Sequence, residues 1–116
     1  MQIIICTSEK VYKDRYREPD KKPDPDAEER EWPVPYWHTD AGCALMLILL
    51  AAVNEGLAGA FVGLWPQEEL QELLGIPRHF MPIGVALVGH GAPDVPSPSL
   101  KRGRRKLENV LHWERW

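Results

Sequence analysis

Hydrophobic residues gather in separate stretches of the chain, and each stretch predicts one element of secondary structure. Gln2–Thr7 holds three consecutive isoleucines, and residues 82–89 (PIGVALVG) are apolar almost throughout. Unbroken apolar runs of this length are typical of strands buried on both faces, which normally lie in the middle of a sheet. The chain is therefore expected to build a small sheet that includes these two strands.

The longest apolar stretch predicts a helix over residues 40–57, with Thr39 or Asp40 as its N-cap. Its apolar residues lie all the way round the helix rather than along one stripe, which is typical of a helix buried on every side. A chain of 116 residues hardly supplies that much cover by itself. We therefore expect residues 41–53 to form the interface of a homodimer, with small side chains that allow close approach at Ala44, Ala51 and Ala52.

A short apolar segment and a second helix lie between the long helix and the second strand. Residues 59–64 alternate small and larger apolar residues. Pro66 suits the first position of a helix, and Gly75 suits the residue that ends it. The spacing i, i+3, i+4 places an apolar stripe on this helix at Leu70, Leu73 and Leu74.

Two polar regions complete the pattern. Residues 8–38 are rich in proline and charge and predict a long loop, and residues 92–116 form a C-terminal extension that ends in an amphipathic segment. The aromatic end of the loop, residues 32–37, either covers the core or forms one wall of a ligand pocket. Together the elements predict a single α+β domain over residues 1–116, with helices covering a small sheet.

Composition and charge limit the partners and the cellular compartment expected for this domain. The net charge of −3 argues against nucleic acid as the main partner. The apolar run 41–53 is shorter than the roughly 20 residues that span a bilayer, and no signal peptide is evident. Cys6 and Cys43 stand alone and are interpreted as buried thiols, and the histidines show no metal-ligand spacing. We expect a soluble cytoplasmic protein without a metal or a membrane partner.

Three stretches in order resemble the C-terminal half of the nitroreductase family. They are Asp40-Ala41-Gly42 with its apolar helix and residues 52–57, then residues 70–89 with their "LGIP" and "PIG" motifs, and then residues 101–116 (KRGRRKLENVLHWERW). The resemblance implies an FMN-containing homodimer whose central helix lies in the interface and whose C-terminal tail crosses to the partner's sheet. It also implies hydride transfer from NAD(P)H through FMN to a nitro, quinone or related acceptor.

The resemblance also implies the residues that hold FMN. In the family, two basic residues two positions apart bind the FMN phosphate just before the closing strand, and they match Arg102 and Arg104 here. A solvated run of charge is the alternative for these arginines. The family places its strand-to-helix connection against the flavin ring, and the matching positions, for which plain core packing is the alternative, are Phe61, Val62, Gly63 and Leu64.

The aromatic residues before the long helix are the candidates for the substrate pocket. Tyr36, Trp37 and His38 are expected to line the substrate side of the flavin. Because a flavin carries the hydride chemistry itself, no catalytic side chain is assigned. The family's Arg-Arg-Ser-type motif for FMN has no match in residues 1–39. The alternative function is therefore a non-catalytic, dimerising protein of the same fold that holds no flavin.

Overall fold

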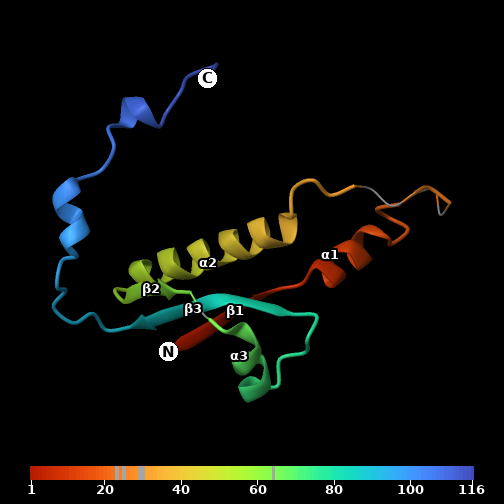
Figure 1. Ribbon diagram of the computed structural model, residues 1–116, viewed down its shortest axis with the longest axis horizontal. Coiled ribbons are helices and arrows are strands. Elements are labelled where there is room, and N and C mark those ends of the chain that lie inside the picture. Colours follow the sequence, from red (N-terminus) through yellow and green to blue (C-terminus); the bar gives the residue numbers. More distant parts are fainter. Residues whose placement is uncertain (23, 25, 29–30, 64) are drawn as a thin grey trace.

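The computed structural model describes residues 1–22, 24, 26–28, 31–63 and 65–116. Figure 1 shows a small sheet, one long helix beside it, and a tail that leaves the body of the protein. The α+β class predicted from the sequence is confirmed. The elements in chain order are β1 (Gln2–Thr7), α1 (Glu9–Tyr16), α2 (Tyr36–Asn54), β2 (Ala58–Val62), α3 (Gln67–Leu74), β3 (Met81–Gly89) and the 3₁₀ turns η1 (Pro98–Arg102) and η2 (Leu107–Asn109).

The described strands form one antiparallel sheet in the order β1-β3-β2. Both predicted strands are confirmed, with β3 in the centre. The expectation that β1 is a central strand buried on both faces is wrong for this chain, because β3 is its only neighbour among the described residues. Of its residues, only Ile5 and Thr7 are buried. Its apolar character reflects packing against α2 rather than cover on both faces.

Gly84 in β3 sets the position of β2. It pairs with Ile5 just where the register of β1 shifts, between Ile5 and Cys6. A Cβ atom at Gly84 would lie 2.3 Å from the Phe61 ring and 2.7 Å from the Val62 carbonyl oxygen. Glycine is therefore required here so that the Phe61 side chain can cross β3 at close range.

The core lies between α2 and the sheet. Its buried residues are Ile5, Ala41 and Ala86, and apolar side chains from β1, α2 and β3 pack around them at Ile3, Leu45, Ile48, Leu49 and Ile83. In Figure 1, α2 and α3 lie on either side of β3. The small side chains at the centre let α2 approach the sheet closely.

Helix α2 begins one turn earlier than the sequence predicted. Its N-cap is Pro35, without a side-chain hydrogen bond, so the prediction of Thr39 or Asp40 as the cap is wrong. Proline has its φ preset for a turn at this point, and Tyr36 continues directly into the helix. The helix ends at Asn54, shortly before Gly56 with φ 71°.

Only one face of α2 is covered in a single chain. Ala41 and Ala52 are buried, but the opposite face is open to solvent. The apolar side chains on this open face are Met46, Leu47, Leu50 and Val53, which are 54%, 67%, 58% and 66% exposed. The predicted burial on every side is therefore not achieved within one chain, because the small sheet reaches only one side of the helix.

By length and composition alone, α2 would also suffice to cross a membrane. It has 19 residues and a mean hydropathy of 1.4. The apolar run 41–53 is shorter than a membrane span, but the helix extends it at its N-terminal end to Tyr36. Helix α2 contacts all three described strands, but only 11% of its apolar window is buried in a single chain.

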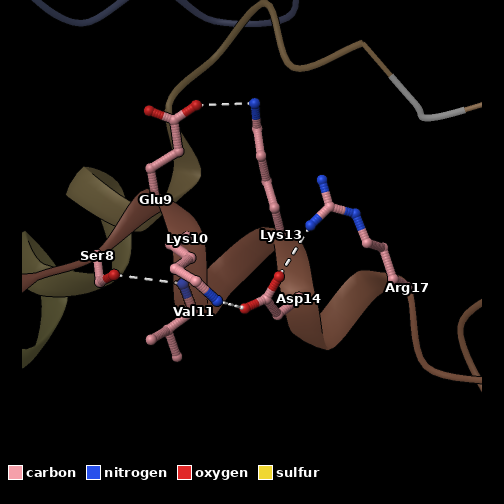
Figure 2. Close-up of polar contacts among 7 residues, drawn as sticks. All are labelled: Ser8, Glu9, Lys10, Val11, Lys13, Asp14 and Arg17. Carbon is pink, nitrogen blue, oxygen red and sulfur yellow. Dashed lines mark hydrogen bonds and ion pairs between the residues drawn. The ribbon is translucent and has the colours of Figure 1, made fainter. Parts of the chain in front are cut away.

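Helix α1 corrects the prediction of a continuous loop over residues 8–38. The buried Ser8 caps it, because the Ser8 hydroxyl accepts a hydrogen bond of 3.2 Å from the Val11 amide. Figure 2 shows the ion pairs along its surface: Lys13 with Glu9 at 2.7 Å, Arg17 with Asp14 at 2.8 Å, and Lys10 with Asp14. Opposite charges three or four residues apart favour a helix, although α1 lacks the apolar stripe by which helices are usually recognised.

The structure confirms where the second predicted helix ends but not where it begins. It also shows an exposed tail. Helix α3 ends as predicted at Gly75, which has φ 65°. Pro66 is the N-cap rather than the first helical residue. Residues 89–116 are exposed throughout, and Figure 1 shows the tail running away from the sheet of its own chain.

Candidate functional site

The predicted flavin-ring segment forms the end of β2. Phe61 and Val62 lie on this strand and are 44% and 46% exposed in a single chain. Gly63 follows the strand directly, and Leu64 lies outside the described residues. The open surface of Phe61 and Val62 can pack against a partner group.

The predicted phosphate ligands lie in the tail. Arg102 is the last residue of η1, and Arg104 follows Gly103, whose φ of 72° turns the backbone between them. Both arginines are exposed, and neither pairs with a carboxylate among the described residues. Their guanidinium groups therefore remain available for an anion such as a phosphate.

The predicted substrate-pocket residues form the first turn of α2 rather than the end of a loop. The Thr7 hydroxyl donates a hydrogen bond of 2.6 Å to the Trp37 carbonyl oxygen, which fixes the start of α2 to the end of β1. Trp37 and His38 are half-buried, whereas Tyr36 is exposed. The aromatic pair Tyr12 and Trp37 joins this turn to α1, with ring centroids 6.0 Å apart.

A single chain does not bring the three predicted groups together. The start of α2 lies near α1, β2 lies across the sheet, and the tail with Arg102 and Arg104 leaves from the far end of β3 (Figure 1). Tyr36, Trp37 and His38 are thus separated from both arginines within one subunit.

A cavity of about 660 Å³ opens between the end of β1, α1 and the start of α2, and we call it the α1–α2 cleft. Its wall includes Cys6 and Thr7 from β1 and Phe80 from the segment before β3, and of the predicted pocket residues it includes Trp37. The side chains facing it from the helices include Tyr12, Tyr16, Ala41 and Ala44. Sequence reasoning missed this cleft because it treated α1 as loop, although Tyr12 and Tyr16 have the i, i+4 spacing of one helix face.

Aromatic rings line this region closely. Tyr12 and Tyr16 lie 5.0 Å apart between ring centroids. Trp32 meets both rings edge-on, at 5.2 Å from Tyr12 and 4.8 Å from Tyr16. These separations are those of favourable aromatic pairs, so the cluster stabilises α1 against the start of α2.

A hydrogen bond affects the protonation of Tyr12. The Tyr12 hydroxyl donates to the Tyr16 hydroxyl at 3.4 Å. This bond, together with desolvation, raises the pKa of Tyr12 to about 12. Tyr12 therefore stays protonated at neutral pH and keeps its bond to Tyr16.

One charged group on the wall of the cleft, Arg15, forms ion pairs. Asp20 binds Arg15 through both oxygens at 2.7 Å, and Glu18 adds a third contact at 2.9 Å. The bonds from Arg15 lower the pKa of Asp20. Burial raises the pKa of the Cys6 thiol, which favours its neutral form. Among the residues that the structure describes, no cluster of histidine, cysteine or acidic side chains is arranged to hold a metal ion.

The fold and this site define an α+β protein with a long apolar helix packed on a small antiparallel sheet. The sequence profile of the Nitroreductase family matches residues 2–90. The chain therefore belongs to the nitroreductase family, as its motifs indicated.

The chain is similar to curated relatives and to solved structures. A protein of Archaeoglobus fulgidus, whose name proposes NADH dehydrogenase or NAD(P)H nitroreductase activity, is 31% identical over 90 residues, which are 74% of this chain and 51% of that protein. A protein of Methanothermobacter thermautotrophicus with the same name is 31% identical over 87 residues, covering 70% of this chain and 42% of that protein. The chain thus spans about half the length of these curated relatives.

The structural likenesses extend over nearly the whole chain. The structure of B. megaterium NfrA1 has a TM-score of 0.66 at 24% identity and covers 99% of this chain and 45% of its own. A nitroreductase family protein of Clostridium difficile 630 has a TM-score of 0.65 at 20% identity, with 99% and 59% covered. At these identities the likeness establishes the nitroreductase fold.

Proposed function

We propose that the chain forms one subunit of a homodimeric, FMN-dependent oxidoreductase that passes hydride from NAD(P)H to a nitro, quinone or related acceptor. The observation that carries this proposal is the family match over residues 2–90, together with relatives named for NAD(P)H nitroreductase activity. With both cysteines free, we place the protein in the reducing cytoplasm.

The residues of the tail fit the phosphate of FMN. Arg102 and Arg104 are exposed and pair with no carboxylate among the described residues. Planar guanidinium groups donate two parallel hydrogen bonds to phosphate oxygens. In the proposal these two side chains hold the phosphate, and the turn at Gly103 directs them toward one anion.

The end of β2 fits the flavin ring. Phe61 and Val62 offer apolar surface that remains open in the single chain. Gly63 adds a backbone segment with no side chain, next to which a ring can lie closely. In the proposal these residues pack against one side of the ring and exclude water from it.

The dimer supplies the cover that a single chain lacks. The open face of α2 and the apolar side chains of the tail, among them Leu107 at 69% and Trp113 at 79% exposed, are proposed to meet a second copy. The tail runs away from its own sheet. In the proposal it crosses to the second copy and brings Arg102 and Arg104 to the partner's β2.

Bound FMN supplies the hydride chemistry, and the chain orients the reactants and excludes water. No side chain is required as a catalytic acid or base. In the proposal Tyr36, Trp37 and His38 at the start of α2 cover the substrate side of the site.

A comparison of FMN with riboflavin tests this proposal. Each charge-assisted hydrogen bond to the phosphate contributes roughly 1.5–3 kcal/mol. The double variant Arg102→Ala/Arg104→Ala is therefore expected to bind FMN about two to four orders of magnitude more weakly than the wild type. Riboflavin lacks the phosphate, so its affinity is expected to stay unchanged. Quenching of flavin fluorescence measures both affinities.

The controls separate binding from folding. An equal loss for both ligands would show that the arginines act through folding, and no loss for either would make them a solvated charge run. If the wild type binds neither flavin, the chain is a non-catalytic, dimerising protein of this fold.

A further inference from the structure

The α1–α2 cleft offers aromatic surface to a small ligand. Its volume of about 660 Å³ lies within the roughly 300–1,000 Å³ that ligand pockets occupy. The half-buried rings of Tyr12, Tyr16 and Trp37 lie on its wall, together with that of Phe80. The Tyr12 and Trp37 rings lie 6.0 Å apart between centroids and are tilted by 60°, so they form two differently oriented parts of the wall.

Two rings of this wall already lie beside ammonium groups of the chain itself. The Lys21 ammonium is 5.7 Å from the centroid of the Tyr16 ring, and the Lys13 ammonium is 5.9 Å from that of the Trp37 ring. An ammonium group at this distance is attracted by the negative face of the ring. Lys13 lies outside the wall of the cleft, and no cation lies over the Tyr12 ring among the residues that the structure describes. The rings therefore suit cations, and the cleft side of Tyr12 and Trp37 can receive another one.

One negative charge at the cleft is left without a balancing cation. Arg15 binds Asp20 through both oxygens and contacts Glu18 as well. Lys21 also lies near Asp20, because its charge contributes, after the bonds from Arg15, to the lowered pKa of that carboxyl. These two cations and two carboxylates balance one another. Asp40 lies on the wall too, and its carboxylate forms no ion pair with any residue that the structure describes.

Asp40 lies close to the Tyr12 and Trp37 rings. It follows Trp37 by three positions in α2, which places the two side chains on the same side of the helix. Its charge also reaches Tyr12, because it adds to the raised pKa of Tyr12, of which the hydrogen bond to Tyr16 is the main cause. Ring faces and a carboxylate are all negative, so together they attract a cation and disfavour an anion.

We propose that the α1–α2 cleft binds a small organic cation with a methylated ammonium group, which lies against the rings of Tyr12 and Trp37 and beside the carboxylate of Asp40. Aromatic rings bind quaternary ammonium ions because the methyl groups pack on the ring while the charge meets its negative face. This role goes beyond the proposed oxidoreductase activity, since it requires neither flavin nor hydride transfer and the cation is not an electron acceptor.

Two ligands of the same shape test the role of the charge. Choline carries a trimethylammonium group, and its neutral isostere is the dimethylbutanol in which a carbon atom replaces the charged nitrogen. A contact between a cation and a ring, together with a partly exposed ion pair, corresponds to roughly a three- to thirtyfold difference in affinity. NMR titration of the full chain without added flavin is expected to show choline binding about that much more tightly than the isostere.

The variant Asp40→Asn tests the carboxylate, because it keeps the size of the side chain and removes its charge. It is expected to bind choline about two- to fivefold more weakly than the wild type, with the affinity for the neutral isostere unchanged. Asp94→Asn is the matched control, since Asp94 is also exposed and lies outside the wall. This control is expected to bind both ligands as the wild type does.

The variant Trp37→Leu tests the ring. It keeps an apolar side chain but removes the aromatic face, so the preference for choline over its isostere is expected to fall about two- to fivefold. Trp65→Leu is the control, because Trp65 is 87% exposed and lies outside the wall. Thermal unfolding checks that each variant is folded. The exposed position of Asp40 keeps the first test decisive if Trp37→Leu does not fold.

Several outcomes would overturn the proposal. Equal affinities of the wild type for choline and its isostere, or no binding of either, would do so. An equal loss in Asp40→Asn and Asp94→Asn would assign the effect to the overall charge of the protein rather than to the cleft. An equal loss of both ligands in Trp37→Leu would show that the ring acts by packing alone. A trimethyllysine peptide that binds where choline does not would replace the small molecule by a modified protein.

Discussion

At the scale of single residues, Gly84 connects the sheet to the candidate flavin surface. The Phe61 ring lies where a Cβ of residue 84 would stand. Because Phe61 belongs to β2 and Gly84 to β3, the contact also holds the proposed ring-binding edge against the central strand. Because residue 84 is a glycine without a side chain, the Phe61 ring can lie at this position.

Gly84→Ala is expected to destabilise the protein by about 1–3 kcal/mol, as overpacking of a tight contact does. The added Cβ would meet the Phe61 ring at 2.3 Å and the Val62 carbonyl at 2.7 Å, so the strands must separate. Urea unfolding measures the change. Gly89→Ala in the same strand is the control, because nothing lies within 4 Å of a Cβ there. Equal stability of the two variants would contradict the tight contact.

At the scale of elements, α1 is held by charges and a cap rather than by a buried face. None of its residues is buried, and Lys10 and Arg17 both bind Asp14. The hydrogen bond from Lys10 is the main cause of the lowered pKa of Asp14, and the bonds from Arg15 lower that of Asp20. Helix α1 positions Tyr12 and Tyr16, so its stability bears on the cleft.

The helicity of α1 is expected to fall in acid. A carboxylate whose pKa is lowered in the folded state stabilises that state above its ordinary pKa of 3.8, and this contribution is lost as the pH falls through the lowered value. Cα chemical shifts of α1, followed by NMR from pH 6 downward, measure the loss. High salt is expected to reduce the effect, because these pairs are exposed.

Asp14→Asn removes one of these titrating groups. Its acid transition in α1 is expected to be shallower than that of the wild type, whereas Asp94→Asn in the tail leaves it unchanged. Identical transitions in the wild type and Asp14→Asn would show that these ion pairs do not hold α1.

At the scale of the whole molecule, α2 and the tail leave apolar side chains open to solvent. The protein measures 57 × 47 × 28 Å, because its tail extends away from the sheet. The open face of α2 and the tail each carry several exposed apolar side chains, and large exposed apolar patches mark contacts with a partner.

Leu47→Glu is expected to abolish the proposed dimer, because a charge buried without a partner costs several kcal/mol. Leu73→Glu on α3 is the matched control: the two leucines are 67% and 78% exposed in a single chain, so only an interface on α2 distinguishes them. Sedimentation velocity measures the assembly state. A monomeric wild type at micromolar concentration would contradict the proposed dimer. Equal effects of both variants would mean that the interface is not formed by α2 in particular.

Deletion of residues 107–116 is expected to weaken the dimer and lower its melting temperature. The deleted segment carries Leu107, Val110, Leu111 and Trp113, which gain cover only if they dock on another surface. Concentration-dependent sedimentation and thermal unfolding together measure this. An undiminished dimer with the same melting temperature would show that the tail does not take part in it.

Local signals in the sequence alone were enough to predict several elements, the family and the candidate residues of this protein. The apolar runs of β1, β3 and α2 specify these elements because each residue type favours burial wherever it stands, and Gly75 ends α3 because glycine readily adopts a positive φ. The order of the motifs was enough to predict the family, and Arg102, Arg104, Phe61 and Val62 were identified as candidates by their match to it.

Contacts between distant residues decided the rest. The place of β1 at the edge depends on which strands pair, and the start of α2 is tied to β1 through Thr7 and Trp37. The α1–α2 cleft unites residues from Cys6 to Phe80, whose spacing along the chain carries no common signal. Burial and hydrogen bonding depend on distance in space, so only the tertiary structure could show that Tyr12 and Tyr16 share one wall with Trp37 and Phe80.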